Sequence, residues 1–151
     1  MNCKKKGLLV GFVSLDEIQV TTLRRINVPG GDVLHAIKMS DPSFTSFGEA
    51  YFSWVNPGAI KAWKFHRQMT LNLVVPVGEV NFVFHEINSR TFREVCLGEN
   101  HYIRLTVPPR IWFGFKGCSP SPSLLLNISD IPHDPNEVET KNLNEIKYEW
   151  H

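Results

Sequence analysis

The sequence predicts an all-β fold, a sandwich or barrel of short strands. Apolar and aromatic runs recur along the chain, and turns rich in Gly, Pro and Asn separate them at intervals of roughly 8–12 residues. Only residues 142–148 have a helical pattern, late and short. The chain of 151 residues is 42% hydrophobic and 11% aromatic, enough to bury the core of one domain, so we expect residues 1–151 to form a single domain.

The first part of the chain contains four expected strands. They cover residues 7–13, 18–28, 33–38 and 47–55, with turns at 29–31, 41–43 and 56–58. Residues 7–13 follow three lysines and imitate a signal peptide. The apolar run is short and two acidic residues follow at 16–17, which favours a first strand instead.

Residues 58–86 are the stretch around which the chain is organised, and they are predicted to form a β-hairpin. Strand 60–66 carries large side chains, and strand 71–77 is nearly continuous apolar, as expected of a strand packed on both faces. Gly78 and Glu79 form the expected turn, and 80–86 returns. The polar exceptions mark either a satisfied network or a site. They are Lys61, Lys64, His66, Arg67 and Asn72.

The second part of the chain continues in the same way. The expected strands are 92–97, 102–107, 111–115 and 124–128, with turns at 98–100, 108–109 and 119–122. There is no internal repeat and no linker long enough to divide the chain.

Charge and cysteine content exclude several classes of partner. The net charge of +1 gives no bulk attraction to nucleic acid or to an anionic membrane, and no apolar run approaches the ~18 residues of a membrane span. Cys3, Cys96 and Cys118 are widely spaced and odd in number, which favours reduced thiols in a cytoplasmic protein. An anionic ligand would have to be held by local basic groups.

The central stretch can be aligned with the metal-binding pattern of cupins, but its residues do not fit a metal. Gly58, Gly78 and His66 occupy pattern positions, whereas Lys64 and Leu71 stand where a histidine and a glutamate are needed. A first-row metal requires roughly three protein ligands, and an ammonium group repels a cation. We therefore expect no metal and no cofactor.

Several segments give a more specific resemblance. In order they are KAWKFH (61–66), VGEVNFV (77–83), GEN (98–100), TVPPRIWFGF (106–115), LLLNISD (124–130) and HDP (133–135). Together they resemble the dTDP-4-dehydrorhamnose 3,5-epimerase family of sugar-nucleotide metabolism. The resemblance implies a cupin double-stranded β-helix, or jelly-roll barrel, that needs no metal. It also implies a homodimer that takes a nucleoside-diphosphate sugar with a 4-keto group, in the synthesis of cell-surface polysaccharide.

The residues that carry out the reaction in this family are replaced here. By position, Lys61 stands for the arginine that holds diphosphate, and Lys64 stands for the catalytic histidine. The catalytic tyrosine falls at Leu126, a pocket lysine falls near Leu71 or Asn72, and another histidine is replaced by Phe113. The resemblance thus supports the predicted fold more strongly than it supports the family's reaction mechanism.

Two residues of the central strand could still supply a base for a carbon acid. Histidine starts near a pKa of ~6.5, and lysine starts near ~10.4 but is lowered by burial and neighbouring cations. We expect Lys64 or His66 to be the catalytic base and the other to stabilise the enolate oxygen. Tyr51 and Tyr102 are candidates for the proton donor on residue type alone.

The expected substrate-binding residues are Lys61, Trp63, Met69, Asn72, Trp112 and Asn127. Several candidates also have a structural interpretation. Trp63 and Trp112 suit barrel packing, Met69 suits a core, and a lone histidine such as His66 is often a hydrogen-bonded structural residue. Two other functions stay open: a 3,4-ketoisomerase, or a nucleotide-sugar binding protein without catalysis.

Overall fold

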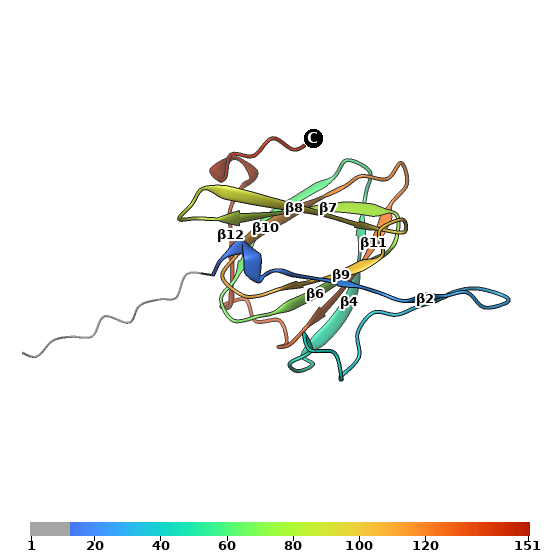
Figure 1. Ribbon diagram of the computed structural model, residues 1–151. Helices are drawn as coiled ribbons and strands as arrows, with labels where there is room; N and C mark the ends of the chain where they lie inside the picture. Colours follow the sequence, from blue (N-terminus) through green and yellow to red (C-terminus); the bar gives the residue numbers. More distant parts are fainter. Residues whose placement is uncertain (1–12) are drawn as a thin grey trace, which may run out of the picture.

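The computed structural model describes residues 13–151, and its regular structure is β-strand apart from two short 3-10 turns (Figure 1). In chain order the elements are η1 (Leu15–Glu17), β1 (Gln19–Thr22), β2 (Arg25–Ile26), β3 (Val33–Leu34), β4 (Glu49–Val55), β5 (Ile60–His66), β6 (Leu71–Val77), β7 (Glu79–Glu86), β8 (Thr91–Gly98), β9 (Ile103–Val107), β10 (Trp112–Gly117), β11 (Ser123–Ser129), β12 (Val138–Thr140) and η2 (Leu143–Glu145).

Ten of these strands form two five-stranded antiparallel sheets that face each other. The first, named here the β4 sheet, has the order β1-β9-β6-β11-β4. The second, the β5 sheet, has the order β12-β5-β10-β7-β8. Figure 1 shows the two layers one above the other; consecutive strands alternate between them from β4 to β7, whereas β7 and β8 pair within the β5 sheet. The predicted all-β cupin jelly roll is confirmed.

The hydrophobic core lies between the two sheets. Leu73 and Val75 of β6 and Leu105 of β9 enter it from the β4 sheet, and Phe82 and Phe84 of β7 enter it from the β5 sheet. These residues alternate along their strands because successive side chains point to opposite faces. The same alternation directs Asn72 and Val74 of β6 away from the core.

The predicted hairpin over residues 58–86 is wrong. β6 pairs with β9 and β11, whereas β7 pairs with β8 and β10, so the two strands lie in opposite sheets. Gly78 makes the corner between them at φ +77°, and a Cβ there would lie 2.3 Å from Ser123 Oγ. The apolar character of 71–77 and 80–86 fits strands that face each other across a core equally well as strands paired at their edges.

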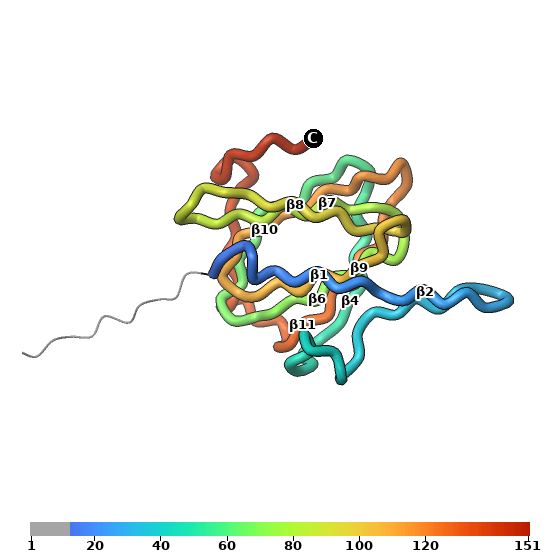
Figure 2. The backbone as a smooth tube through the Cα atoms, in the orientation of Figure 1, coloured from blue at the N-terminus to red at the C-terminus, as the bar shows by residue number. Residues whose placement is uncertain are grey.

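Two other expectations differ in detail, one strand was not expected, and one expected strand is almost entirely outside the described residues. The run 18–28 is divided into β1, which pairs with β9, and β2, which pairs with β3 in a separate two-stranded ribbon. This ribbon projects beyond the two sheets as an arm in Figures 1 and 2. The helical pattern at 142–148 yields only the turn η2, and β12 has no signal of its own in the sequence. The predicted strand at 7–13 lies outside the described residues except for its last position.

The outer face of the β5 sheet is covered by the chain after β12. Trp63 exchanges two backbone hydrogen bonds with Lys141, of 3.0 and 3.1 Å, and its indole N–H donates to the Leu143 carbonyl. Trp63, Trp112 and Ile146 are buried together in this layer. The C-terminal segment thereby supports β5 from the side opposite the core.

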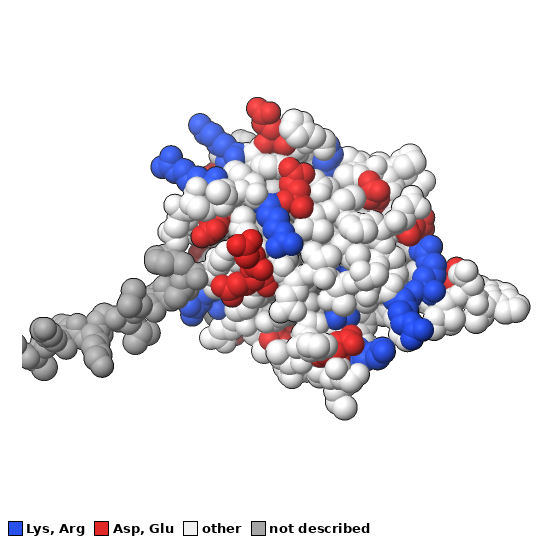
Figure 3. Space-filling model, viewed as in Figure 1, with Lys and Arg blue, Asp and Glu red and all other residues white. Residues whose placement is uncertain are grey.

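The surface shows no large region of one charge in the view of Figure 3, where acidic and basic side chains are interspersed. No helix within residues 13–151 has the length and apolar character needed to cross a membrane.

Candidate active site between the sheets

A cavity of about 290 Å³ opens between the two sheets. Part of its lining is apolar core, including Leu73, Phe82 and Leu125, and the rest consists of polar side chains from β4, β5, β11 and the segment 133–140. A cavity that joins an apolar wall to converging polar groups is the usual form of a small-molecule site.

Strand β5 directs three polar side chains into this cavity: Lys61, Lys64 and His66. Alternation accounts for Lys64 and His66, which are two residues apart. Lys61 reaches the same side because the register with β10 shifts between Phe113 and Phe115, so Ala62 and Trp63 together oppose Gly114. Only glycine fits at 114, where a Cβ would lie 2.5 Å from the Ala62 Cβ.

His66 is held by a buried carboxylate. Its Nδ1 lies 2.6 Å from Glu137 Oε1, and the two side chains are only 13% and 6% exposed. The Glu137 carbonyl accepts a hydrogen bond from the Arg67 backbone N–H, and Val138 pairs with His66 across β12 and β5. A carboxylate at Nδ1 fixes the tautomer that carries hydrogen on Nδ1 and leaves Nε2 as the free, basic nitrogen. The pair can therefore accept a proton within the cavity.

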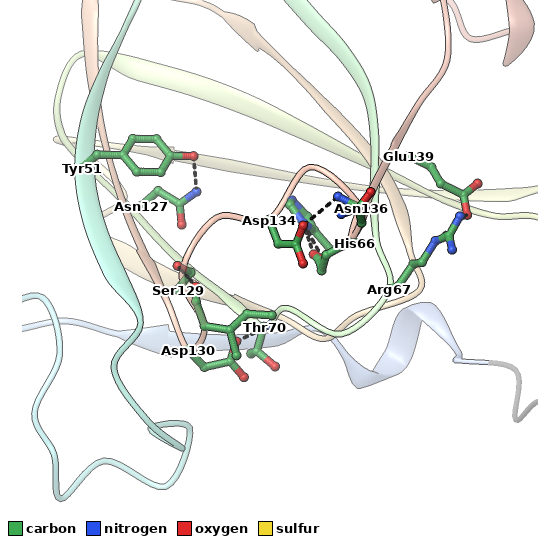
Figure 4. A network of polar contacts seen from close by, with 12 residues as sticks. Tyr51, His66, Arg67, Thr70, Asn127, Ser129, Asp130, Asp134, Asn136 and Glu139 are labelled. Atoms are coloured by element: carbon green, nitrogen blue, oxygen red, sulfur yellow. Dashed lines mark hydrogen bonds and ion pairs between the residues drawn. The ribbon is translucent and has the colours of Figure 1, made fainter.

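The opposite wall carries Tyr51 and Asn127, which are register partners on β4 and β11. The Asn127 Nδ2 donates to the Tyr51 hydroxyl oxygen at 2.9 Å, and Figure 4 shows the two side chains pointing toward each other. The Asn127 Oδ1 is buried and has no hydrogen-bond partner among residues 13–151. Since His66 extends from the β5 sheet and Tyr51 from the β4 sheet, the two face the cavity from different sides.

Two lysines give the cavity positive charge. The Lys61 ammonium donates to the Trp54 carbonyl at 3.0 Å and to Ser53 Oγ at 3.2 Å, which leaves one of its three hydrogens for a ligand. Within the described part of the chain, no carboxylate forms an ion pair with Lys61 or Lys64. These charges are therefore free to attract an anionic group such as a diphosphate.

The expected site residues fall into two groups. Five line the cavity: Lys61, Lys64, His66, Met69 and Asn127. Three lie elsewhere: Trp63 and Trp112 are packed beneath the C-terminal segment, and Asn72, on the outer face of the β4 sheet, accepts a hydrogen bond from Thr106. Of the two expected tyrosines, Tyr51 lines the cavity. Tyr102 does not line it, and its hydroxyl donates to the His35 carbonyl.

Sequence reasoning missed Glu137 and His133, which come from the segment between β11 and β12. Glu137 stands 71 residues from His66, and no local pattern connects them. The sequence signal for this segment is HDP at 133–135, which is part of the family resemblance and ends two residues before Glu137.

Other chemistries find less support in the described residues. No three His, Cys, Asp or Glu side chains within 13–151 are grouped so that they could hold a metal ion. Burial raises the pKa of the Cys96 thiol to about 12, which makes it a poor nucleophile at neutral pH.

Two known proteins are similar to this chain over most of its length. A dTDP sugar isomerase from Desulfovibrio desulfuricans G20 is 37% identical, with a TM-score of 0.84, over 89% of this chain and 91% of that chain. The spore coat polysaccharide biosynthesis protein SpsL of Bacillus subtilis (strain 168) is 21% identical over 134 residues, which are 85% of this chain and 89% of SpsL.

A more distant structure shares the fold. It is dTDP-6-deoxy-D-glucose-3,5-epimerase RmlC from Legionella pneumophila Philadelphia 1, in complex with dTDP-4-keto-L-rhamnose. The TM-score is 0.75 at 15% identity, over 92% of this chain and 81% of that chain. No protein-family model matches the sequence. With 37% identity to the Desulfovibrio isomerase over nearly the whole of both chains, this protein belongs to the dTDP-4-dehydrorhamnose 3,5-epimerase family of dTDP-sugar isomerases and epimerases.

Proposed function

We propose that this protein is a sugar-nucleotide epimerase that moves protons next to the ketone of a nucleoside-diphosphate 4-keto-6-deoxy sugar. The observation that carries the proposal is the His66–Glu137 pair, 2.6 Å apart, in a cavity that also holds two lysines without carboxylate partners. The buried Glu137 carboxylate orients the His66 imidazole as a base, and the lysines suit an anionic substrate.

In the first step, His66 Nε2 takes the proton from the carbon next to the ketone. The electrons of the broken C–H bond form a C=C bond, and the ketone oxygen becomes an enolate. Lys64 faces the same cavity from the same strand and supplies positive charge for that oxygen. Glu137 stabilises the imidazolium that forms on His66.

In the second step, Tyr51 returns a proton to the carbon from the opposite side, and the ketone forms again. The Tyr51 oxygen accepts a hydrogen bond from Asn127, which stabilises the phenolate that remains. Tyr51 is 46% exposed, so water can restore its proton and remove the proton from His66. The net result of one round is inversion of one centre and exchange of its hydrogen with solvent, and a second round at the carbon on the other side of the ketone inverts that centre.

The substrate class follows from charge and from the relatives. Lys61 lies at the β4 edge of the cavity and is proposed to bind the diphosphate as a point charge, without the paired contacts of an arginine. The isomerase from Desulfovibrio is named for dTDP sugars, and SpsL is named for polysaccharide biosynthesis. We therefore place this protein in the supply of sugars for cell-surface polysaccharide, and in the cytoplasm, where free thiols such as Cys96 and Cys118 persist.

The direct test is deuterium uptake from D2O. The pure protein is incubated with freshly generated dTDP-4-keto-6-deoxyglucose, and the sugar is followed by mass spectrometry and NMR. Uptake at C3 and C5 is the expected result. Uptake at C3 alone would indicate a mono-epimerase or a 3,4-ketoisomerase, which the position of the carbonyl in the product distinguishes. Tight binding without uptake would overturn the catalytic proposal and leave a nucleotide-sugar binding protein.

We also propose that the protein is a homodimer that pairs through the outer face of the β4 sheet. Phe52 and Trp54 project from this face and are 63% and 60% exposed, and Trp54, Asn56, Val77 and Pro122 form a shallow apolar groove. Residues of this groove carry no charge, so two copies can meet without repulsion. A second copy of the chain is the occupant because a two-fold axis brings the same patch against itself.

Replacing Trp54 by glutamate is expected to separate the dimer, because it places a charge in the centre of an apolar interface. We expect the dissociation constant to rise by at least about 100-fold, as for other central aromatic residues. Light scattering after size-exclusion chromatography measures the change as a halved mass. Phe47→Glu is the matched control, since Phe47 is an equally exposed aromatic outside the groove. A wild-type monomer, or a dimer that persists in Trp54→Glu, would contradict this interface.

A further inference from the structure

The Asn127 side chain has an unused hydrogen-bonding group. Asn127 is 8% exposed, and its Nδ2 donates a hydrogen bond of 2.9 Å to the Tyr51 hydroxyl oxygen. Its Oδ1 is fully buried and has no partner among residues 13–151. A buried carbonyl oxygen without a donor is costly, and nearly all such groups in native proteins are satisfied. This oxygen needs a donor that residues 13–151 do not provide.

Asn127 is one of the residues that line the cavity, so a ligand bound there lies beside its side chain. Asn127 lines it beside Leu125 on its own strand and Leu73 on the neighbouring strand, and neither side chain can donate. No lysine or histidine of the cavity lining donates to this oxygen, and the two hydrogen bonds of the Lys61 ammonium go to Ser53 and Trp54. A ligand can bring such a donor, and on a sugar the donors are ring hydroxyls.

We propose that Asn127 binds a ring hydroxyl of the sugar, with its Oδ1 accepting a hydrogen bond from that hydroxyl. This inference takes its ligand class from the proposed function. Because the amide group is planar, a hydroxyl bound at Oδ1 also fixes the direction of Nδ2 and so the position of the Tyr51 oxygen. Asn127 then selects sugars that carry this hydroxyl, and the bound hydroxyl holds the amide in the orientation in which its Nδ2 donates to the Tyr51 oxygen.

Binding of unreactive sugars tests the selection apart from catalysis. The probes are dTDP-6-deoxyglucose and its 2-deoxy and 3-deoxy forms, which have no ketone and so cannot undergo the reaction. Calorimetry with the wild-type protein should show that one deoxy form binds about 10–100-fold more weakly than the parent sugar. In Asn127→Leu the parent and that deoxy form should bind equally, because the acceptor is gone.

Asn127→Asp separates selection from positioning. The carboxylate keeps an acceptor and nearly the same shape, so the ratio between the two sugars should persist even if the added charge weakens both. It cannot donate to Tyr51, so the rate of deuterium uptake should fall while the binding ratio stays. Melting temperatures within a few degrees of wild type would show that both variants are folded.

Three results would overturn the inference. Equal binding of all three sugars by the wild type would mean that water satisfies Oδ1. If Asn127→Leu still binds the deoxy sugar more weakly than the parent, another residue makes the selection. If the wild type binds none of the three sugars, the proposed ligand class is wrong. Discrimination by the wild type that is lost in Asn127→Leu, without deuterium uptake from the keto sugar, would uphold the inference while the catalytic proposal fails.

Discussion

Replacing His66 by alanine is expected to lower deuterium uptake into the keto sugar by about 10²–10⁴-fold, the usual contribution of a positioned general base. His66 is the cavity residue whose Nδ1 is held by Glu137, so its Nε2 is the group placed to take a proton. Binding of the unreactive dTDP-6-deoxyglucose should change little, because the diphosphate contacts are assigned to Lys61. The rate of exchange and the affinity are measured separately on the same preparation.

Added imidazole distinguishes a lost base from a damaged site. The rings of His66 and Phe113 stack with their centroids 6.0 Å apart. The alanine variant therefore leaves a space beside Phe113 that free imidazole can enter. Partial recovery of exchange that increases with imidazole concentration is expected. His85→Ala is the matched control, because His85 stacks on Phe92 on the outer side of the β5 sheet and should not affect the rate.

The same experiment decides between the two residues that the sequence left open. Lys64→Met should lower exchange less than His66→Ala, since Lys64 is solvent-exposed and acts through charge. If Lys64→Met abolishes exchange and His66→Ala retains it, the base is Lys64 and the role of the His66–Glu137 pair is structural.

The sequence predicted the strands well and their pairing poorly. Period-two alternation and turn residues are local signals, so strands such as Ile60–His66 and Leu71–Val77 were located to the residue. Whether two strands pair at their edges or face each other across a core depends on contacts far along the chain. The corner at Gly78 was therefore interpreted as a hairpin turn, although it carries the chain from one sheet to the other.

The candidate site shows the same division. Lys64 and His66 were expected on one face because alternation places them there, and the cavity contains both. Trp63, which lies between Lys61 and Lys64, points away because two residues of β5 oppose Gly114. Asn72 points outward because Leu71 and Leu73 take the core side of β6. Irregular register and the choice of inner face are properties of the assembled sheets and have no local signal.

Glu137 had no signal in the sequence, and it gives the second prediction of large effect. Glu137→Gln is expected to lower deuterium uptake by about 10³–10⁴-fold with little loss of stability. An amide in this position donates its N–H to His66 Nδ1, which moves the ring hydrogen to Nε2 and blocks the nitrogen that must accept the proton. The shape of the side chain is kept, so the packing around β12 should survive.

Two measurements check this explanation. Exchange kinetics give the loss of rate, and ¹⁵N NMR of the His66 ring reports which nitrogen carries the hydrogen. Glu139→Gln is the matched control two residues away, because Glu139 pairs with Arg67 at 2.9 Å on the surface, where both side chains are well exposed and such pairs contribute little. Figure 4 shows this pair away from Tyr51 and Asn127. A Glu137→Gln protein that keeps the wild-type rate after its His66 tautomer has changed would show that the pair holds the strand and takes no part in proton transfer.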